Sequence, residues 1–174
     1  MDDATETLSS LLTWKAGGTD LWPLLRDPRA TDVVAHGLAT PFAGAVDVVL
    51  GPDPGGVLFG PLVARVLGVP FAPVCRDRAF FFQGPHEAVA VETPGGDLVA
   101  HRAALGDGAR VLVVDDWSES GSTAKGVAAI VEATGARLVA IAFLVDSLDD
   151  GVRESLRGKG IGVHGLATPA GLMR

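Results

Sequence analysis

The chain of 174 residues is 48 % hydrophobic and 20 % charged, which is the size and composition of one globular domain with its own core. Its formal net charge of −7, with only 14 lysines and arginines, argues against a reader of duplex DNA, and no apolar run approaches the roughly 20 residues that cross a bilayer. A single cysteine, Cys75, excludes an internal disulfide, and the N-terminus is acidic, unlike a secretory signal, so we expect a cytoplasmic protein without nucleic-acid or membrane partners.

The first half of the chain predicts a helical region and then a strand–helix–strand unit. An apolar β-branched run ends at Leu50, before a loop rich in Pro and Gly that marks the end of a strand. Beyond the loop, apolar residues recur at helical spacing up to Leu67, and Gly68 suits the left-handed residue that ends a helix. The predicted elements are a helical region over 20–38, a strand over 46–50, a loop over 51–56, a helix over 57–67 and a strand over 69–74.

The second half predicts a hairpin and then strands that alternate with helices. Two short apolar runs flank a turn of Pro, Gly and Asp at 94–97, which is typical of paired antiparallel strands. The predicted elements are strands over 88–93, 98–102 and 111–114, a helix over 124–133, a strand over 138–145, a helix over 148–156 and a strand over 162–166. This alternation predicts an α/β fold, with a mostly parallel, doubly wound sheet and flanking helices, in one domain over residues 1–174.

The most informative stretch covers residues 111–123. Four apolar residues, typical of a strand buried on both faces, run into the adjacent carboxylates Asp115 and Asp116. A loop of small hydroxyl residues around Gly121 precedes a predicted helix, so peptide N–H groups and hydroxyls are available to an anion. Open α/β sheets bind ligands at the carboxyl ends of their strands. The combination favours a ligand that has both hydroxyls and a phosphate, such as a sugar phosphate.

This stretch resembles the phosphoribosyl diphosphate signature of the type I phosphoribosyltransferases, in which a hydrophobic strand, two acids and two hydrophobic residues precede a phosphate loop with Thr and Gly. Three further blocks, at residues 22–28, 47–71 and 98–105, are similar to the adenine phosphoribosyltransferase branch and follow the family's order. The resemblance covers roughly residues 20–166. It implies the type I fold, with a small N-terminal hood over about residues 1–45 and a lid with a hairpin over about residues 76–102.

The resemblance also implies roles for individual residues. Asp115 and Asp116 bind the ribose hydroxyls, directly or through Mg²⁺, the loop 118–123 wraps the 5′-phosphate, and the loop 53–56 holds the diphosphate. Arg76 is expected to face the diphosphate and to act in catalysis. The residues expected to contact phosphoribosyl diphosphate are Asp53, Pro54, Gly55, Gly56, Arg76, Arg78, Asp115, Asp116, Ser118, Glu119, Ser120, Gly121, Ser122 and Thr123.

The chain departs from the family pattern at several of these positions. Ser120 and Ser122 replace the usual Thr and Gly but keep a hydroxyl and a small volume. Gly55 stands where the adenine branch usually has an arginine, which removes a cation beside the diphosphate. The segment 79–87, with the aromatic triplet 80–82, replaces a lysine-rich loop. The triplet is interpreted as part of the core or a dimer contact, or alternatively as an apolar wall over a base.

Two residues of the signature have alternative interpretations. Glu119 is either the general acid/base that manages the proton on a base nitrogen or a solvated loop acid. Trp117 is either a base-binding residue that stacks on a nucleobase or a residue that packs against the rest of the protein just past the predicted strand.

The resemblance therefore implies a Mg²⁺-dependent phosphoribosyltransferase. It would convert a nucleobase, an adenine-like purine first of all, to its nucleoside monophosphate with release of diphosphate, and it would form a homodimer. Two alternatives remain at this stage: a non-catalytic sensor that binds phosphoribosyl diphosphate on the same fold, and a transferase that acts on a non-purine acceptor.

Overall fold

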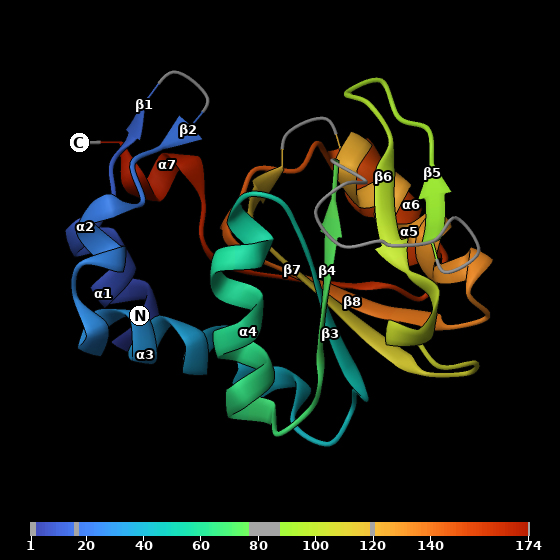
Figure 1. The fold of residues 1–174 in the computed structure, drawn as a ribbon. Coiled ribbons are helices and arrows are strands. Elements are labelled where there is room, and N and C mark those ends of the chain that lie inside the picture. Colours follow the sequence, from blue (N-terminus) through green and yellow to red (C-terminus); the bar gives the residue numbers. More distant parts are fainter. Residues whose placement is uncertain (1–2, 16–17, 77–87, 119–120, 174) are drawn as a thin grey trace.

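A seven-stranded sheet forms the centre of the computed structural model, which describes residues 3–15, 18–76, 88–118 and 121–173 (Figure 1). The five strands from β4 to β9 in the sheet are parallel, and β6 and β5 extend the β4 edge as an antiparallel hairpin. The predicted doubly wound sheet and hairpin are thereby confirmed. The strands in sheet order are β5 (Ala88–Val91), β6 (Leu98–His101), β4 (Phe71–Cys75), β3 (Val48–Pro52), β7 (Arg110–Ser118), β8 (Arg137–Asp146) and β9 (Gly162–Ala167).

Helices cover both faces of this sheet. The helices α1 (Asp3–Leu11), α3 (Pro28–Ala39) and α4 (Gly55–Leu67) pack on one face, and α5 (Ser122–Ala133) and α6 (Asp150–Gly158) pack on the other. Among the described residues, the other elements are a ribbon of β1 (Trp14–Lys15) with β2 (Gly18–Thr19), the short helices α2 (Trp22–Leu25) and α7 (Pro169–Leu172), and single turns of 3₁₀ helix at Thr40–Phe42 and Arg102–Ala104. None of the described helices is long and apolar enough to cross a membrane.

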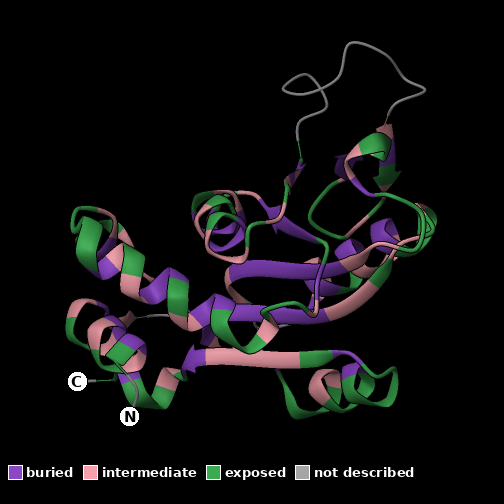
Figure 2. Cartoon of the chain, turned by 90° about the horizontal axis from the view of Figure 1, so that it is seen from below, coloured by how far each residue is buried: buried purple, intermediate pink, exposed green. Residues whose placement is uncertain are grey.

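The alternation of side chains along the strands builds two cores, one on each face. On β7, Leu112 and Val114 join the core under α1, α3 and α4, whereas Val111 and Val113 join the core under α5 and α6. The central strands are therefore buried on both faces, as Figure 2 shows by the purple colour of the middle of the sheet. This is the physical reason why β7 and β8 are continuous apolar runs in the sequence.

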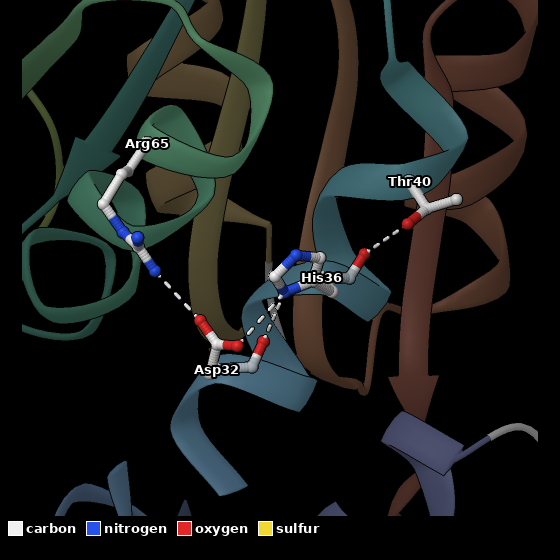
Figure 3. A network of polar contacts seen from close by, with 4 residues as sticks. All are labelled: Asp32, His36, Thr40 and Arg65. Atoms are coloured by element: carbon white, nitrogen blue, oxygen red, sulfur yellow. Dashed lines mark hydrogen bonds and ion pairs between the residues drawn. The ribbon is translucent and has the colours of Figure 1, made fainter. Parts of the chain in front are cut away.

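The helix α3 of the N-terminal segment packs on the sheet and begins at a capping residue, Asp27. The carboxylate of Asp27 accepts hydrogen bonds from the peptide N–H groups of Arg29 and Ala30, and Pro28 occupies the first turn. Arg65 of α4 donates to Asp32 of α3 over 2.9 Å, in an exposed network that includes His36 and Thr40 (Figure 3). Exposed pairs of this kind add little stability, so the buried apolar contacts hold α3 against α4.

A second ion pair joins the starts of two neighbouring central strands. Arg110, the first residue of β7, donates from its Nη2 to Oδ1 of Asp47 over 2.7 Å and from its Nε to Oδ2 over 3.0 Å. The hydrogen bonds from the Arg110 side chain and backbone lower the pKa of Asp47 from 3.8 to about 2. A carboxyl whose pKa is lowered by folding stabilises the folded protein at pH values above the pKa that it has in the unfolded chain. This contribution is lost as the pH falls through the lower pKa of the folded state.

We therefore expect Asp47→Asn to lower the thermal unfolding midpoint at pH 7, and the difference from the parent protein to shrink as the pH falls from 3.8 towards 2. Unfolding curves at pH 7, 4 and 3 measure this. Glu92→Gln, at an exposed acid just beyond β5, is the control and is expected to leave the midpoint unchanged. A deficit of Asp47→Asn that stays constant over this range would contradict the ion pair.

Candidate functional site

The carboxyl ends of β3 and β7 form the point where the chain connections of the sheet diverge. These strands are neighbours, but β3 leads through α4 to β4 on one side, and β7 leads through α5 to β8 on the other. Such a switch point opens a crevice in which α/β proteins bind ligands. A cavity of about 300 Å³ lies here. Its lining residues are Asp53, Pro54, Arg76, Asp115, Asp116, Trp117, Ser122 and Thr123.

The structure thus brings together eight of the residues that the sequence singles out. A larger hollow of about 600 Å³ lies between α5 and α6, where alanine and other apolar side chains are flanked by dispersed charges. It has no converging pair of carboxylates. The smaller cavity at the switch point is therefore the candidate site, and the ligand contacts of its residues remain predictions.

The acid pair at the end of β7 is tightly held and poorly solvated. Oδ1 of Asp115 accepts from the peptide N–H of Asp116 over 2.9 Å, and Oδ1 of Asp116 accepts from the N–H of Trp117 over 2.9 Å. Burial, and then the neighbouring charge of Asp116, raise the pKa of Asp115 well above its usual range, and burial also raises the pKa of Asp116. A cation or the hydroxyls of a ligand would stabilise the charged pair.

Two glycines at the start of α4 make room for this pair. A Cβ atom on Gly55 would lie 2.2 Å from Cγ of Asp116, and one on Gly56 would lie 2.4 Å from the carbonyl oxygen of Val114. The first turn of α4 therefore rests directly on the backbone and acid pair of β7. An arginine at position 55, which the family resemblance leads one to expect, would require Asp116 to move.

Asp53 and Arg76 also line the cavity. The peptide N–H of Arg76 donates to Oδ2 of Asp53 over 3.2 Å, and the guanidinium donates to the carbonyl oxygen of Gly95, in the hairpin turn, over 2.9 Å. The other carboxylate oxygen of Asp53, Oδ1, is buried and has no hydrogen-bond partner among the described residues. A buried oxygen in this state calls for a donor or cation from outside the described residues.

The start of α5 provides the anion-binding end of the cavity. Gly121 caps the helix in the left-handed conformation, with φ of +66°, and Ser122 and Thr123 form its first turn. The first N–H groups of a helix have no partner within the helix, so this turn attracts an anion. A Cβ on Gly121 would lie 2.6 Å from Cγ1 of Val152, on the first turn of α6. Arg153 anchors that turn to Asp146, at the end of β8, through bonds of 2.6 and 2.8 Å.

Several predicted residues cannot be placed in this geometry. Glu119, Ser120, Arg78 and the aromatic triplet 80–82 lie outside the described residues, as does the side chain of Ser118. Trp117 is placed: its indole ring makes an edge-to-face contact with Trp14 of β1, with ring centroids 5.4 Å apart and planes at 88°. Sequence reasoning missed Trp14, because an isolated aromatic residue outside any predicted element carries no signal of its partner. In the described part of the chain, no three His, Cys, Asp or Glu residues are grouped to hold a metal ion.

Comparison with known proteins identifies relatives with the same arrangement. A family model described as a phosphoribosyl transferase domain matches residues 30–157. An adenine phosphoribosyltransferase from Methylococcus capsulatus is 37 % identical over 150 residues, covering 84 % of this chain and 85 % of that relative. One from Azorhizobium caulinodans is 33 % identical over 153 residues, covering 87 % of this chain and 86 % of the relative.

Solved structures extend the similarity to the fold. Adenine phosphoribosyltransferase from Thermoanaerobacter pseudethanolicus superposes with a TM-score of 0.78 at 28 % identity, covering 94 % of this chain and 98 % of that one. The enzyme from Trypanosoma brucei, in complex with AMP, pyrophosphate and ribose-5-phosphate, superposes with a TM-score of 0.81 and covers 98 % of this chain and 81 % of that one. Its identity of 16 % shows a shared fold alone.

The contact between Gly121 and α6 can be tested against another left-handed glycine. Gly121→Ala places a methyl group against Val152, whereas Gly108→Ala adds the same methyl at φ of +71° with nothing within 4 Å. We expect Gly108→Ala to lower the free energy of unfolding by about 1 kcal/mol through backbone strain alone, and Gly121→Ala to add a packing loss of about 1–3 kcal/mol. Denaturant unfolding measures both. Val152→Ala in the Gly121→Ala background should recover the difference, and equal losses at the two glycines would contradict the contact.

The space that Gly55 leaves for Asp116 predicts a coupling between the two positions. Gly55→Ala should lower the free energy of unfolding by about 1–3 kcal/mol, because Asp116 has to shift. Gly151→Ala, in the first turn of α6 with nothing within 4 Å, is the matched control and should be neutral. A double-mutant cycle with Asp116→Ala should give a coupling energy of about 0.5–3 kcal/mol, and additive effects would show that the two positions do not meet.

Proposed function

The chain belongs to the phosphoribosyltransferase family, and on that premise we propose that it transfers the phosphoribosyl group of 5-phosphoribosyl 1-diphosphate to a purine base with Mg²⁺. Adenine is the proposed acceptor, with AMP and diphosphate as products, because the relatives at 33–37 % identity are named adenine phosphoribosyltransferases. The observation that carries the proposal is the buried acid pair, Asp115 and Asp116, in one cavity with the first turn of α5.

The two ends of the cavity suit the two ends of the donor. The first turn of α5, with the positive end of the helix dipole and the hydroxyls of Ser122 and Thr123, suits the 5′-phosphate. The acid pair suits the 2′- and 3′-hydroxyls of the ribose, which can donate to carboxylates. The loop 53–56 and Arg76 then face the diphosphate, where the guanidinium would neutralise developing negative charge on the leaving group.

The carboxylates also fit Mg²⁺, which prefers oxygen ligands and keeps several waters together with substrate oxygens. Asp115 and Asp116 would hold the ion, and Asp53 lines the same cavity without being grouped with them as a third ligand. Such an ion, when bound, supplies positive charge that offsets the charge of the diphosphate. Two carboxylates leave most positions around the ion to water and donor oxygens, which agrees with a metal that arrives with its substrate.

In the proposed reaction, the bond from C1′ of the ribose to the diphosphate oxygen breaks, and a bond from C1′ to a base nitrogen forms. The electron pair of the broken bond leaves with the diphosphate, and the base nitrogen loses its proton. Glu119 is proposed as the group that accepts this proton, on its position in the sequence beside the phosphate loop. Water would compete with the base as nucleophile, so the lid proposed over about residues 76–102 would exclude it.

A second candidate function is a sensor that binds phosphoribosyl diphosphate without turnover. The specific observation in its favour is Gly55, which removes the arginine expected beside the diphosphate and cannot be replaced without moving Asp116. A transferase with a non-purine acceptor is a third candidate, since the donor site would be the same. For all three, a homodimer is proposed from the family resemblance. A cytoplasmic location is proposed because the one cysteine, Cys75, cannot form an internal disulfide.

Release of diphosphate separates these candidates. The protein is incubated with phosphoribosyl diphosphate, Mg²⁺ and, in turn, adenine, hypoxanthine, guanine and orotate, and diphosphate and nucleotide are measured. We expect release with adenine and formation of AMP. Release only with orotate supports the non-purine acceptor, and binding of the donor without release for any base supports the sensor.

Asp115→Asn is the control that assigns the release to this cavity. It removes a carboxylate of the acid pair, and loss of one charge-assisted hydrogen bond of about 1.5 kcal/mol or more should raise the KM for the donor at least about tenfold. An unchanged KM would place the donor elsewhere. Glu132→Gln, at an exposed acid in the last turn of α5 that does not line the cavity, should leave the KM unaltered.

A further inference from the structure

Trp117 lines the candidate cavity two residues after Asp115, yet its indole ring packs against residues from near the N-terminus. Trp14 of β1 makes the edge-to-face contact over 5.4 Å. Gly18 of β2 also faces the ring, since a Cβ there would lie 3.7 Å from Cζ2 of Trp117. Both tryptophans are half-buried and pack against the core under α1, α3 and α4. The β1–β2 ribbon therefore contacts the cavity wall directly.

The ribbon is too short to be ordered by its own pairing. Trp14 pairs with Thr19 and Lys15 with Gly18, and a two-stranded ribbon of this length is not stable alone in water. Its contact with Trp117 is thus one of the interactions that place it. The same contact limits the rotation of the indole of Trp117, which has two side-chain torsions. Ribbon position and ring position are therefore linked, and a ligand that favours one favours the other.

The ligand that suits this ring is planar and aromatic. Trp117 is the single aromatic residue among those described as lining the cavity, and the other lining groups suit a sugar and phosphates. An edge-to-face contact involves one face of one ring, so it leaves at least one face of Trp117 uncovered by Trp14. Every nucleobase can stack on such a face.

We propose that Trp14 is a positioning residue for the acceptor base: it sets the orientation of Trp117 and so shapes the base-binding wall of the cavity. This rests on the proposed function, because it assumes that a base enters the cavity beside the donor. Trp14 itself need not touch the base. Trp14 contacts the indole ring of Trp117, whereas Trp117 holds the acid pair through its peptide N–H, which donates to Asp116, so we expect the effect of Trp14 on the acceptor rather than on the donor.

The test compares Trp14→Leu and Trp14→Phe with Trp22→Ala, in steady-state kinetics with adenine and phosphoribosyl diphosphate varied separately. Trp14→Leu keeps apolar volume but removes the aromatic edge, so the KM for adenine should rise about tenfold, equivalent to about 1.4 kcal/mol, with the KM for the donor within about twofold of the parent. Trp14→Phe keeps an aromatic edge and should restore most of the affinity. Trp22, on α2 and 70 % exposed, should be replaceable without effect.

Two results would overturn the inference. An unchanged KM for adenine in Trp14→Leu shows that Trp14 does not act on the base wall. Equal increases in both KM values, with a lower unfolding midpoint, show a structural role alone.

Failure of the proposed function gives a different result, namely no transfer to any base by the parent protein. In that case, AMP binding is followed by tryptophan fluorescence in a Trp22→Phe background. Weaker AMP binding after Trp14→Leu supports the positioning role without turnover, whereas equal AMP binding or none overturns it.

Discussion

The close approach of α4 to the end of β7 is the constraint on which the site depends. Gly55 and Gly56 carry no Cβ, so the first turn of the helix lies against the carbonyl of Val114 and the carboxylate of Asp116. This contact removes water from the acid pair, which is why the pKa values of both carboxyls are raised. Burying like charges side by side opposes folding unless they are partnered. The peptide N–H groups of Gly56, Asp116 and Trp117 provide part of that compensation, and the remainder falls to a ligand.

This arrangement gives one small cavity an acidic end and an end that attracts anions. One end has two poorly solvated carboxyls, and the other has the first turn of α5, where the helix dipole is positive. A ligand that is anionic throughout or cationic throughout would meet repulsion at one end. A phosphorylated sugar would satisfy both ends, and a divalent cation held by the carboxyls would offset the repulsion between them and a diphosphate. The chain connections after β3 and β7 run in opposite directions along the sheet, and the cavity for which this chemistry is proposed lies where they separate.

Local sequence predicted the sheet and the residues that line the candidate cavity, because the decisive features are contiguous. The apolar run of β7, the acids that end it and the hydroxyl loop before α5 lie within thirteen residues, and each has its own periodicity or chemistry. Contacts between distant segments could not be predicted in this way. The partner of Trp117 is Trp14 in a ribbon of two-residue strands, and α1 is a short helix with few apolar residues, so neither carries a strong periodic signal. Which glycine faces which side chain is likewise decided by tertiary packing alone.

For Gly55, the sequence and the tertiary structure lead to different interpretations of one residue. In the sequence it is a missing cation, and in the structure it is the space that Asp116 occupies. These are two consequences of one side chain being absent. With an arginine there, a positive charge would stand beside the diphosphate, but the acid could not lie where it does. With glycine, the acid lies over the start of α4, and Arg76 is the one cationic side chain among those that line the described cavity. Under the proposed function, the charge of a departing diphosphate would then be neutralised by Arg76 and by an ion held at Asp115 and Asp116. The proposal therefore assigns to a bound cation a role that the family pattern gives to a fixed arginine, and it places Asp116 at the centre of that role.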